Sequence, residues 1–356
     1  MRKQLTHRRR EEALVSHGVT EGGGDSAEVA LELMPGNKIR KYDTWHAMGQ
    51  GATTGSLVVT LEALKEMHLT PEDIQLIQND TKTCPDTGMA GASRSLYMDG
   101  NATIIAANKL LAAMRKEDGT LRTYDEMKAE GIETKYLGRY ETNTTPGLCR
   151  LDPNTGIGDP TPAFTYCLNL AEVEVDTKTG KTTVLKFTCV DFVGRIGNID
   201  AVNGQAYSGI MHGIGFALKE DYADVKKHAN MFGAGTSYIK DVPDDIDLIH
   251  IDGAISDGPF GSSGASEAFQ ASGHCAVLNG IYNACGVRIH EIPALPEKVK
   301  AGLDAIAKGE KPYEPKKYFL GSDMYEELEN IKENPVQVGT QSFYVSLDDP
   351  TAERPF

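Results

Sequence analysis

The sequence lacks the closely spaced cysteine pairs that structural zinc and iron–sulfur sites use. Its six cysteines are scattered, and no Cys-x-x-Cys pair occurs. The thiolate ligands of such sites lie a few residues apart, so neither kind of site is expected in this chain. Isolated cysteines of a cytoplasmic protein are most often small, buried hydrophobic residues, and we predict this for the whole set. The set comprises Cys84, Cys149, Cys167, Cys189, Cys275 and Cys285.

Long apolar runs and an excess of positive charge are also absent. No run approaches the roughly 20 apolar residues that span a bilayer. The basic stretch at residues 1–10 lacks the apolar segment of a secretory signal. The sequence therefore predicts a cytoplasmic protein without a membrane partner. A formal net charge of -15 argues against a nucleic-acid partner, because phosphate binding needs a basic surface.

Motifs for common cofactors and nucleophiles are missing as well. The spacing of Gly49, Gly51 and Gly55 does not fit Gly-x-Gly-x-x-Gly, and no Gly-Lys-Ser/Thr occurs there, so a nicotinamide or nucleoside triphosphate site is not supported. The nine histidines do not cluster at metal-ligand spacing. The segment Gly264–Glu267 is not the Gly-x-Ser-x-Gly turn of a serine hydrolase.

The chain is long enough for two compact units. Its 356 residues exceed the usual domain size of about 100–150 residues, and its composition is that of an ordinary globular protein. Hairpins and helices without regular strand–helix alternation indicate an α+β fold. We predict a basic, glycine-rich segment with little core over 1–24, a first lobe over 25–150, a second lobe over 151–300 and a loosely attached extension over 301–356.

Residue periodicity predicts two hairpins, a further strand and several helices. Strand pairs are expected at 28–33 with 39–45 and at 168–175 with 182–191, and a short strand at 74–79. Helices are expected at 57–67, 104–112, 124–130, 202–218 and 269–285. The helix at 202–218 carries several glycines, which indicate either close backbone packing or an accommodated ligand.

Three loops of small residues precede helices, at 49–55, 86–95 and 258–267. Glycine lets a backbone approach a ligand closely, and a helix start offers free N–H groups to an anion. Such loops can hold an extended anionic ligand through main-chain donors alone. The third loop ends in an acid, Glu267. The local pattern leaves open whether Glu267 lies beside a ligand or is a first-turn acid that complements the helix dipole.

Four ordered motifs resemble those of the molybdenum hydroxylases, the xanthine dehydrogenase and aldehyde oxidase family. They are His46–Ala52, then Asn79–Thr81 with Gly91–Arg94, then Gly204–Gly209 with Gly213–Gly215, and finally Gly258–Glu267. The stretches Asp221–His228 and Ala284–Ile289 are most similar to bacterial molybdenum-containing aldehyde oxidoreductases. The resemblance is to the C-terminal, molybdopterin-binding portion and implies the two α+β lobes of that family's molybdopterin-binding domain.

The resemblance implies a molybdopterin cofactor, in the cytosine dinucleotide form often found in bacteria. Its dithiolene holds the molybdenum, so no protein side chain is expected as a metal ligand. Glu267 matches the family's catalytic glutamate, which takes a proton from the water or hydroxyl that attacks the substrate. The implied cofactor-binding residues are Gly49, Gln50, Gly51, Ala52, Gly91, Ala92, Ser93, Arg94, Ser95, Gln205, Gly261, Ser262 and Ser263.

The implied activity is the oxidation of an aldehyde and water to a carboxylic acid. A related hydroxylase of purines or other N-heteroaromatics is the alternative enzyme, and a non-catalytic cofactor-binding remnant is an alternative of another class. The family also carries iron–sulfur domains and an earlier molybdenum-binding half, which have no counterpart in this sequence. We therefore expect iron–sulfur clusters on a partner polypeptide or on a missing N-terminal half. The resemblance also allows a homodimer of the full assembly.

Overall fold

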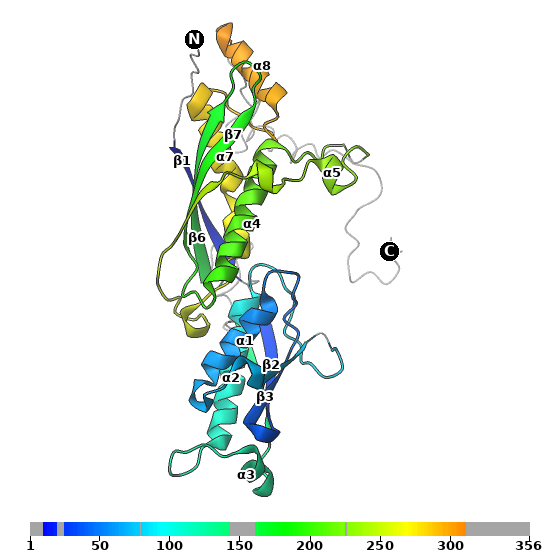
Figure 1. The fold of residues 1–356 in the computed structure, drawn as a ribbon, viewed down its shortest axis with the longest axis vertical. Coiled ribbons are helices and arrows are strands. Elements are labelled where there is room, and N and C mark those ends of the chain that lie inside the picture. The colour runs from blue at the N-terminus through cyan, green and yellow to red at the C-terminus, as the bar shows by residue number, and fades with distance from the viewer. Residues whose placement is uncertain are drawn as a thin grey trace, which may run out of the picture. The chain divides into compact units, whose positions relative to one another are not determined.

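The computed structural model describes residues 10–19, 25–78, 80–142, 161, 163–224 and 226–310, with residues 10–19 described by their backbone alone. All of them belong to one compact unit. They form two four-stranded mixed sheets, ordered β4-β3-β2-β5 and β1-β6-β7-β8, each with helices packed against it (Figure 1). The predicted α+β class is confirmed. No helix of these residues has the length and hydropathy that a bilayer crossing needs.

The first sheet contains the first predicted hairpin. β2 (Ser26–Met34) and β3 (Lys38–Asp43) pair antiparallel around a turn at Pro35–Asn37. β4 (Ile74–Gln78) forms where a short strand was predicted and pairs parallel with β3. β5 (Lys135–Glu141) pairs antiparallel with β2. The sequence analysis did not predict β5, because charged residues interrupt its apolar alternation.

Two helices cover this sheet. α1 (Ala52–Ala63) packs on α2 (Ser95–Met114), and α2 lies on β2 and β5. Gly138 of β5 permits this approach, because a Cβ there would lie 2.1 Å from the Ala102 carbonyl oxygen. A short helix, α3 (Tyr124–Ala129), follows where a helix was expected. The loops before α1 and α2 are therefore placed by helices that the apolar core holds firmly.

The second sheet contains the second predicted hairpin. It is formed by β6 (Ala163–Val175) and β7 (Thr182–Phe192). β1 (Arg10–Val19) pairs antiparallel with β6, and β8 (Asp245–His250) pairs parallel with β7. The sequence analysis expected little structure over residues 1–24, whereas residues 10–19 form an edge strand. Its partner lies about 150 residues away along the chain, and local patterns do not reveal such pairing.

Three helices pack against the second sheet and against one another. They are α4 (Ile199–Leu218), α6 (Ser266–Ala271) and α7 (Gly273–Cys285) (Figure 1). The prediction of a single helix over 269–285 is thus wrong, because the helix is interrupted at Ser272. The buried residues of α7 are Gly273, Ala276, Val277, Gly280, Ile281 and Ala284. These small residues let α7 lie directly on β6.

Cysteine burial follows the prediction only in part. Cys167 and Cys189 are buried as predicted, and Cys84 and Cys285 are half-buried. Cys275 is exposed on α7, so the prediction is wrong for this residue. It lies outside the stripe of small residues that α7 turns toward the strands. Cys149 lies outside the described residues.

The C-terminal part of the described chain is packed rather than loosely attached. α8 (Pro296–Ala307) crosses the boundary that the sequence analysis set at residue 301. Val299 is fully buried, and a Cβ on Gly302 would lie 2.5 Å from Cγ1 of Val287. This helix is therefore part of the compact unit, and the rest of the predicted extension, from residue 311, lies outside the described residues.

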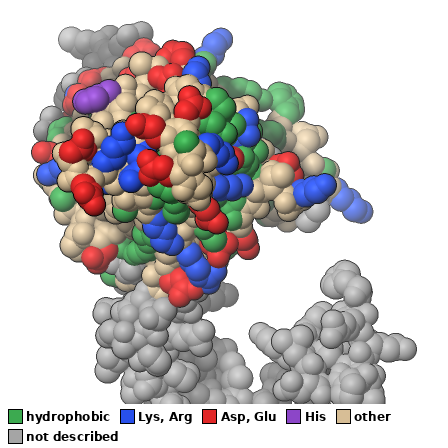
Figure 2. Space-filling view, turned by 90° about the horizontal axis from the view of Figure 1, so that it is seen from below, with side chains coloured by type: hydrophobic (Ala, Val, Ile, Leu, Met, Phe, Trp, Pro, Cys, Tyr) green, Lys and Arg blue, Asp and Glu red, His purple; other side chains and the backbone are tan. Residues whose placement is uncertain are grey.

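Charged side chains of both signs are interspersed on the surface. Figure 2 views the molecule from the lower end of Figure 1 and shows Asp and Glu beside Lys and Arg. Pairs around α3 include Arg122 with Glu130 at 2.7 Å and Lys116 with Glu126 at 2.6 Å. Exposed pairs of this kind contribute little to stability.

A buried charge cluster ties β3 to α2. The Lys41 ammonium lies 2.6 Å from Asp99 and 3.1 Å from Asp43, and all three side chains are fully buried. Ser56 and Gln78 each donate a 2.6 Å hydrogen bond to Asp43. Burial raises the pKa of Asp99 to about 6, although Lys41 opposes the shift. The negative charge of Asp99 therefore costs stability at neutral pH.

The glycines of α4 are explained by helix packing at two positions and not at a third. A Cβ on Gly209 would lie 2.5 Å from Cβ of Phe269, and one on Gly213 would lie 2.9 Å from Cα of Gly273. Gly204 faces open space. Gly209 and Gly213 are thus explained by close backbone packing on α6 and α7 rather than by an accommodated ligand.

The Asp99 carboxyl makes the free energy of unfolding depend on pH. Because its pKa is raised from 3.8 to about 6 on folding, its stabilising effect is complete below pH 3.8 and is lost as the pH rises through 6. We expect the wild-type chain to lose about 1 kcal/mol more than Asp99→Asn between pH 5 and pH 7. Urea unfolding at both pH values measures this. Equal losses in the two proteins would contradict the assignment.

Alanine substitutions separate the two kinds of glycine in α4. Gly209→Ala should lower the free energy of unfolding by about 1–3 kcal/mol, because the methyl group collides with Phe269. Gly204→Ala is the matched control in the same helix and should raise it by about 0.4–1 kcal/mol, because alanine lowers the entropy of the unfolded chain. Urea unfolding of both variants tests this, and a change of the same sign in both would refute the packing argument.

Candidate functional site

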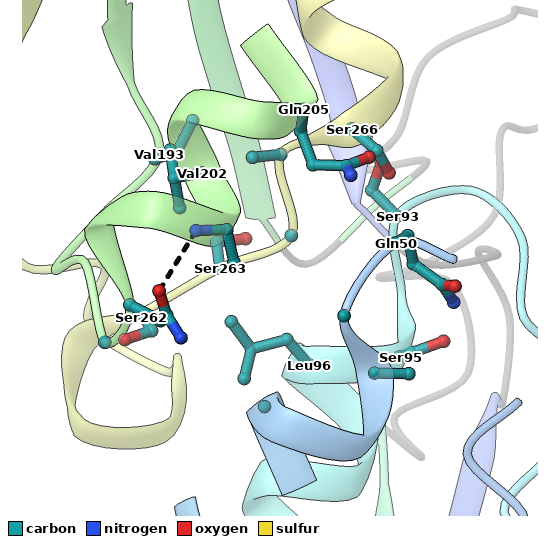
Figure 3. Close-up of a pocket in the computed structure, with 18 of the residues that line it drawn as sticks. Gln50, Ser93, Ser95, Leu96, Val193, Val202, Gln205, Ser262, Ser263 and Ser266 are labelled. Atoms are coloured by element: carbon teal, nitrogen blue, oxygen red, sulfur yellow. Dashed lines mark hydrogen bonds between the residues drawn. The ribbon is translucent and has the colours of Figure 1, made fainter. Parts of the chain in front are cut away.

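The three small-residue loops meet at one cavity of about 570 Å³. This volume lies in the usual range of small-molecule sites. Residues from both halves of the described chain surround it (Figure 3). The predicted site residues that line it are Gln50, Gly51, Ala52, Gly91, Ser93, Ser95, Gln205, Ser262, Ser263 and Glu267. Segments more than 200 residues apart in sequence are thus brought together.

Four predicted site residues do not line the cavity, namely Gly49, Ala92, Arg94 and Gly261. Three of them shape the loops through their backbone. Gly49, Ala92 and Gly261 have φ values of 107°, 48° and 85°, in the left-handed region that turns a loop sharply. They therefore set the path of the loops whose neighbouring residues reach the cavity.

Arg94 is an internal clamp. Its side chain is 2% exposed and binds both carboxylate oxygens of Asp25, at 2.6 and 2.8 Å. Its other donors reach the carbonyl oxygens of Thr87, Met89 and Ser26. All five guanidinium N–H groups are thereby used, so the side chain has no donor left for a ligand. Arg94 instead fixes the loop that carries Ser93.

Two helix starts face the cavity without a side-chain cap. α1 begins after Gly51, whose φ is 90°, and α2 begins after Arg94; neither residue caps its helix through a side chain. Gly51, Ala52 and Ser95 line the cavity. Uncapped starts leave N–H groups that can bind an anion. α4 differs, because the Asn198 side chain accepts a hydrogen bond from its first turn.

A buried hydroxyl supports the presence of a polar ligand. Ser263 is 4% exposed and lines the cavity, and its Oγ has no hydrogen-bond partner within the described chain. A buried hydroxyl without a partner is unfavourable and needs an explanation. Its neighbour Ser262 instead donates to the carbonyl of Arg195 at 2.6 Å. Ser263 is therefore ready to bond to a group in the cavity.

Glu267 lies in the first turn of α6 and at the cavity wall. The hydroxyl of Ser93 donates a hydrogen bond to its carboxylate and accepts one from its backbone N–H at 3.2 Å. Glu267 therefore lies where a carboxylate can complement the helix dipole, and it also faces the cavity, where a ligand can bind. A carboxylate there can accept a proton from a molecule that the cavity holds.

The third loop contacts the second directly. A Cβ on Gly264 would lie 1.6 Å from the carbonyl oxygen of Ser93, so only glycine permits this approach. The sequence analysis singled out the loop but not this residue. Gly264 stands three positions before Glu267, and its close contact therefore sets where the carboxylate can lie.

The sequence analysis also missed the segment after β7. Val193, Arg195, Ile196 and Asn198 line the cavity. Arg195 is the single basic side chain among the lining residues of the described chain. The available signal was Gly194, two residues after the strand. A Cβ there would lie 2.4 Å from the Gly261 carbonyl oxygen, so this segment lies directly against the third loop.

Metal-ligating side chains do not gather in the described part of the chain. Within it, no three His, Cys, Asp or Glu side chains form a group that could hold a metal ion. The polar groups that line the cavity are instead hydroxyls, carboxamides and helix-start N–H groups, together with Arg195 and two glutamates. This donor set suits an extended, polar and partly anionic ligand.

Comparisons with known proteins agree on one family. Residues 12–243 match the molybdopterin cofactor-binding domain. The chain is 41% identical over 283 residues to an aldehyde oxidoreductase of Megalodesulfovibrio gigas, covering 80% of this chain and 31% of the relative. The crystal structure of the aldehyde oxidoreductase from Desulfovibrio desulfuricans aligns with a TM-score of 0.79 at 42% identity, covering 83% of this chain and 32% of the other.

A probable hypoxanthine oxidase of Escherichia coli is a more distant relative. It is 28% identical over 277 residues, covering 73% of this chain and 29% of its own length. The chain thus spans about a third of the length of the curated relatives it matches.

Gly264→Ala tests the contact between the two loops. The added methyl group cannot fit against the Ser93 carbonyl, so we expect the free energy of unfolding to fall by about 1–3 kcal/mol. Trp45, which lines the cavity and is the only tryptophan, reports the transition by fluorescence. Gly204→Ala again serves as the control. A Gly264→Ala chain as stable as the wild type would show that the loops do not meet as described.

Proposed function

The chain belongs to the molybdopterin cofactor-binding domain family, and from this premise we propose that it holds the molybdopterin of an aldehyde oxidoreductase. The observation that carries the proposal is the convergence of three small-residue loops and Glu267 on one cavity. The 41% identity to an aldehyde oxidoreductase supports the reaction class. In this proposal the first lobe, residues 25–150, and the second, residues 151–300, each contribute part of the cofactor site.

The residues present fit the cofactor. Gln50, Gly51 and Ala52 would contact the pterin, and the uncapped start of α2 near Ser95 would receive phosphate oxygens. Ser263 would give its unpaired hydroxyl to the same ligand. When bound, the cofactor would supply the molybdenum and the two-electron redox chemistry. We propose the cytosine dinucleotide form, which the resemblance to bacterial aldehyde oxidoreductases implies.

Glu267 is the proposed general base. The reaction adds the oxygen of water to the aldehyde carbon and releases two protons and two electrons, giving the carboxylic acid. The Glu267 carboxylate would take a proton from the attacking oxygen, because it is the acid of the third loop and borders the cavity. Apolar lining residues such as Leu96 and Val193 would exclude bulk water and orient the substrate.

The electrons need a further carrier. We propose that they pass to iron–sulfur clusters on a partner polypeptide or on a further portion of the enzyme, since the curated relatives are about three times as long as the matched segment. A homodimer of the complete assembly and a cytoplasmic location remain predictions from the sequence.

Purine hydroxylation is the second candidate, and the 28% identity to a probable hypoxanthine oxidase is the observation in its favour. The higher identity to an aldehyde oxidoreductase favours the first. Assays of the assembled enzyme with an aliphatic aldehyde, an aromatic aldehyde and hypoxanthine separate the two. Turnover of hypoxanthine alone would overturn the aldehyde assignment.

Glu267→Gln should abolish turnover in the assembled enzyme. Glutamine keeps the shape of the side chain but cannot take up the proton, so we expect kcat to fall by about 10²–10⁴-fold or more. Molybdenum and pterin content should stay at the wild-type level. Stopped assays and elemental analysis measure the two quantities.

Glu297→Gln is the matched control, because Glu297 also lies in the first turn of its helix, α8, yet is exposed and outside the cavity. If Glu267 served only to complement the dipole of its helix, Glu267→Gln and Glu297→Gln would both keep the kcat of the wild type. Wild-type kcat in Glu267→Gln would remove this residue from the mechanism.

A further inference from the structure

Ser93 makes two hydrogen bonds of opposite direction to one residue. Its Oγ donates to the Glu267 carboxylate and accepts from the Glu267 backbone N–H at 3.2 Å. The hydroxyl of Ser266 lies 3.4 Å away. A single hydroxyl thus binds both the main chain and the side chain of Glu267, which restricts the carboxylate to few rotamers.

The backbone at Ser93 is held in a conformation that serine seldom adopts. Ala92 and Ser93 have φ values of 48° and 51°, both in the left-handed region. Non-glycine residues keep such a conformation where the surrounding structure enforces it, and functional sites are common among these places. The conformation turns the Ser93 side chain toward α6 rather than along α2.

The enforcing contact lies next to Ser93. Arg94 is buried, and its guanidinium joins Asp25 to the carbonyl oxygens of Thr87, Met89 and Ser26. This clamp anchors the loop to the first sheet, because Ser26 opens β2. On the other side, Gly264 lies against the Ser93 carbonyl. Ser93 is therefore fixed between two rigid parts of the chain.

We propose that Ser93 is the positioning residue for Glu267. It fixes the carboxylate in the orientation from which that group can reach a molecule in the cavity. Ser93 thereby links the second small-residue loop, in the first half of the chain, to the proposed general base, Glu267, in the second half. The inference rests on the proposed function for its catalytic consequence, since general-base catalysis depends on hydrogen-bond reach. The hydrogen bonds themselves do not depend on it.

The first test needs no cofactor. Ser93→Gly and Ser93→Ala both remove the hydroxyl, but glycine also relieves the left-handed backbone. In the full chain, the Glu267 amide should exchange with solvent about 10-fold faster in both variants, because it loses its acceptor. NMR exchange measurements with Thr179→Ala, an exposed turn residue, as control give the comparison. Unchanged exchange at Glu267 in both variants would overturn the proposal.

The second test uses the assembled enzyme. Both variants should lower kcat per bound molybdenum by about 10–100-fold, with KM for the aldehyde unchanged. A purely structural role would lower protein yield or cofactor content and leave kcat per bound molybdenum unchanged in the remaining enzyme.

The outcomes separate the two proposals. A wild-type enzyme with full cofactor that turns over no aldehyde would refute the proposed function, while amide exchange would still decide whether Ser93 holds Glu267. An active wild type together with a Ser93→Gly variant of wild-type kcat per bound molybdenum would refute the positioning role alone.

Discussion

The contact between the loop ending at Glu267 and the turn at Ser93 is the constraint on which the site depends. The two segments are 174 residues apart in sequence, and they meet closely enough that a methyl group on Gly264 would overlap the Ser93 carbonyl. This contact closes one side of the cavity and places a carboxylate at its wall. It joins small-residue loops from the two halves of the chain around one cavity.

Each half of the chain contributes rigidity to that contact. In the first half, the Arg94 clamp and the packing of α2 on β2 and β5 hold the Ser93 turn. In the second, Gly209 and Gly213 let α4 lie against α6 and α7, so that the short helix carrying Glu267 is packed on its inner side. Small residues thus act in two ways: in the helices they allow close packing, and in the loops they free the backbone to face the cavity.

The sequence predicted those features that local patterns encode. Alternating residues around turns identified both hairpins, and the loop-to-helix pattern placed Glu267 at a helix start. It did not predict β1 and β8, whose partners lie elsewhere in the chain, or β5, whose apolar alternation is interrupted by charged residues. It also predicted that Cys275 is buried, because cysteine is more apolar than the glycine and alanine residues of α7 that actually face β6. Within the site, Arg94 matched the family motif, yet its donors are all used internally, which only the fold reveals.

We propose that one cavity between these loops holds the molybdenum cofactor beside Glu267. A crystal structure of the cofactor-loaded protein, with the metal located by its anomalous scattering, tests it most directly. We expect a molybdenum peak inside the cavity lined by Gln50, Ser93 and Glu267, within reach of that carboxylate through at most one water molecule. A peak elsewhere on the chain, or a cofactor bound with this cavity filled only by solvent, would contradict it.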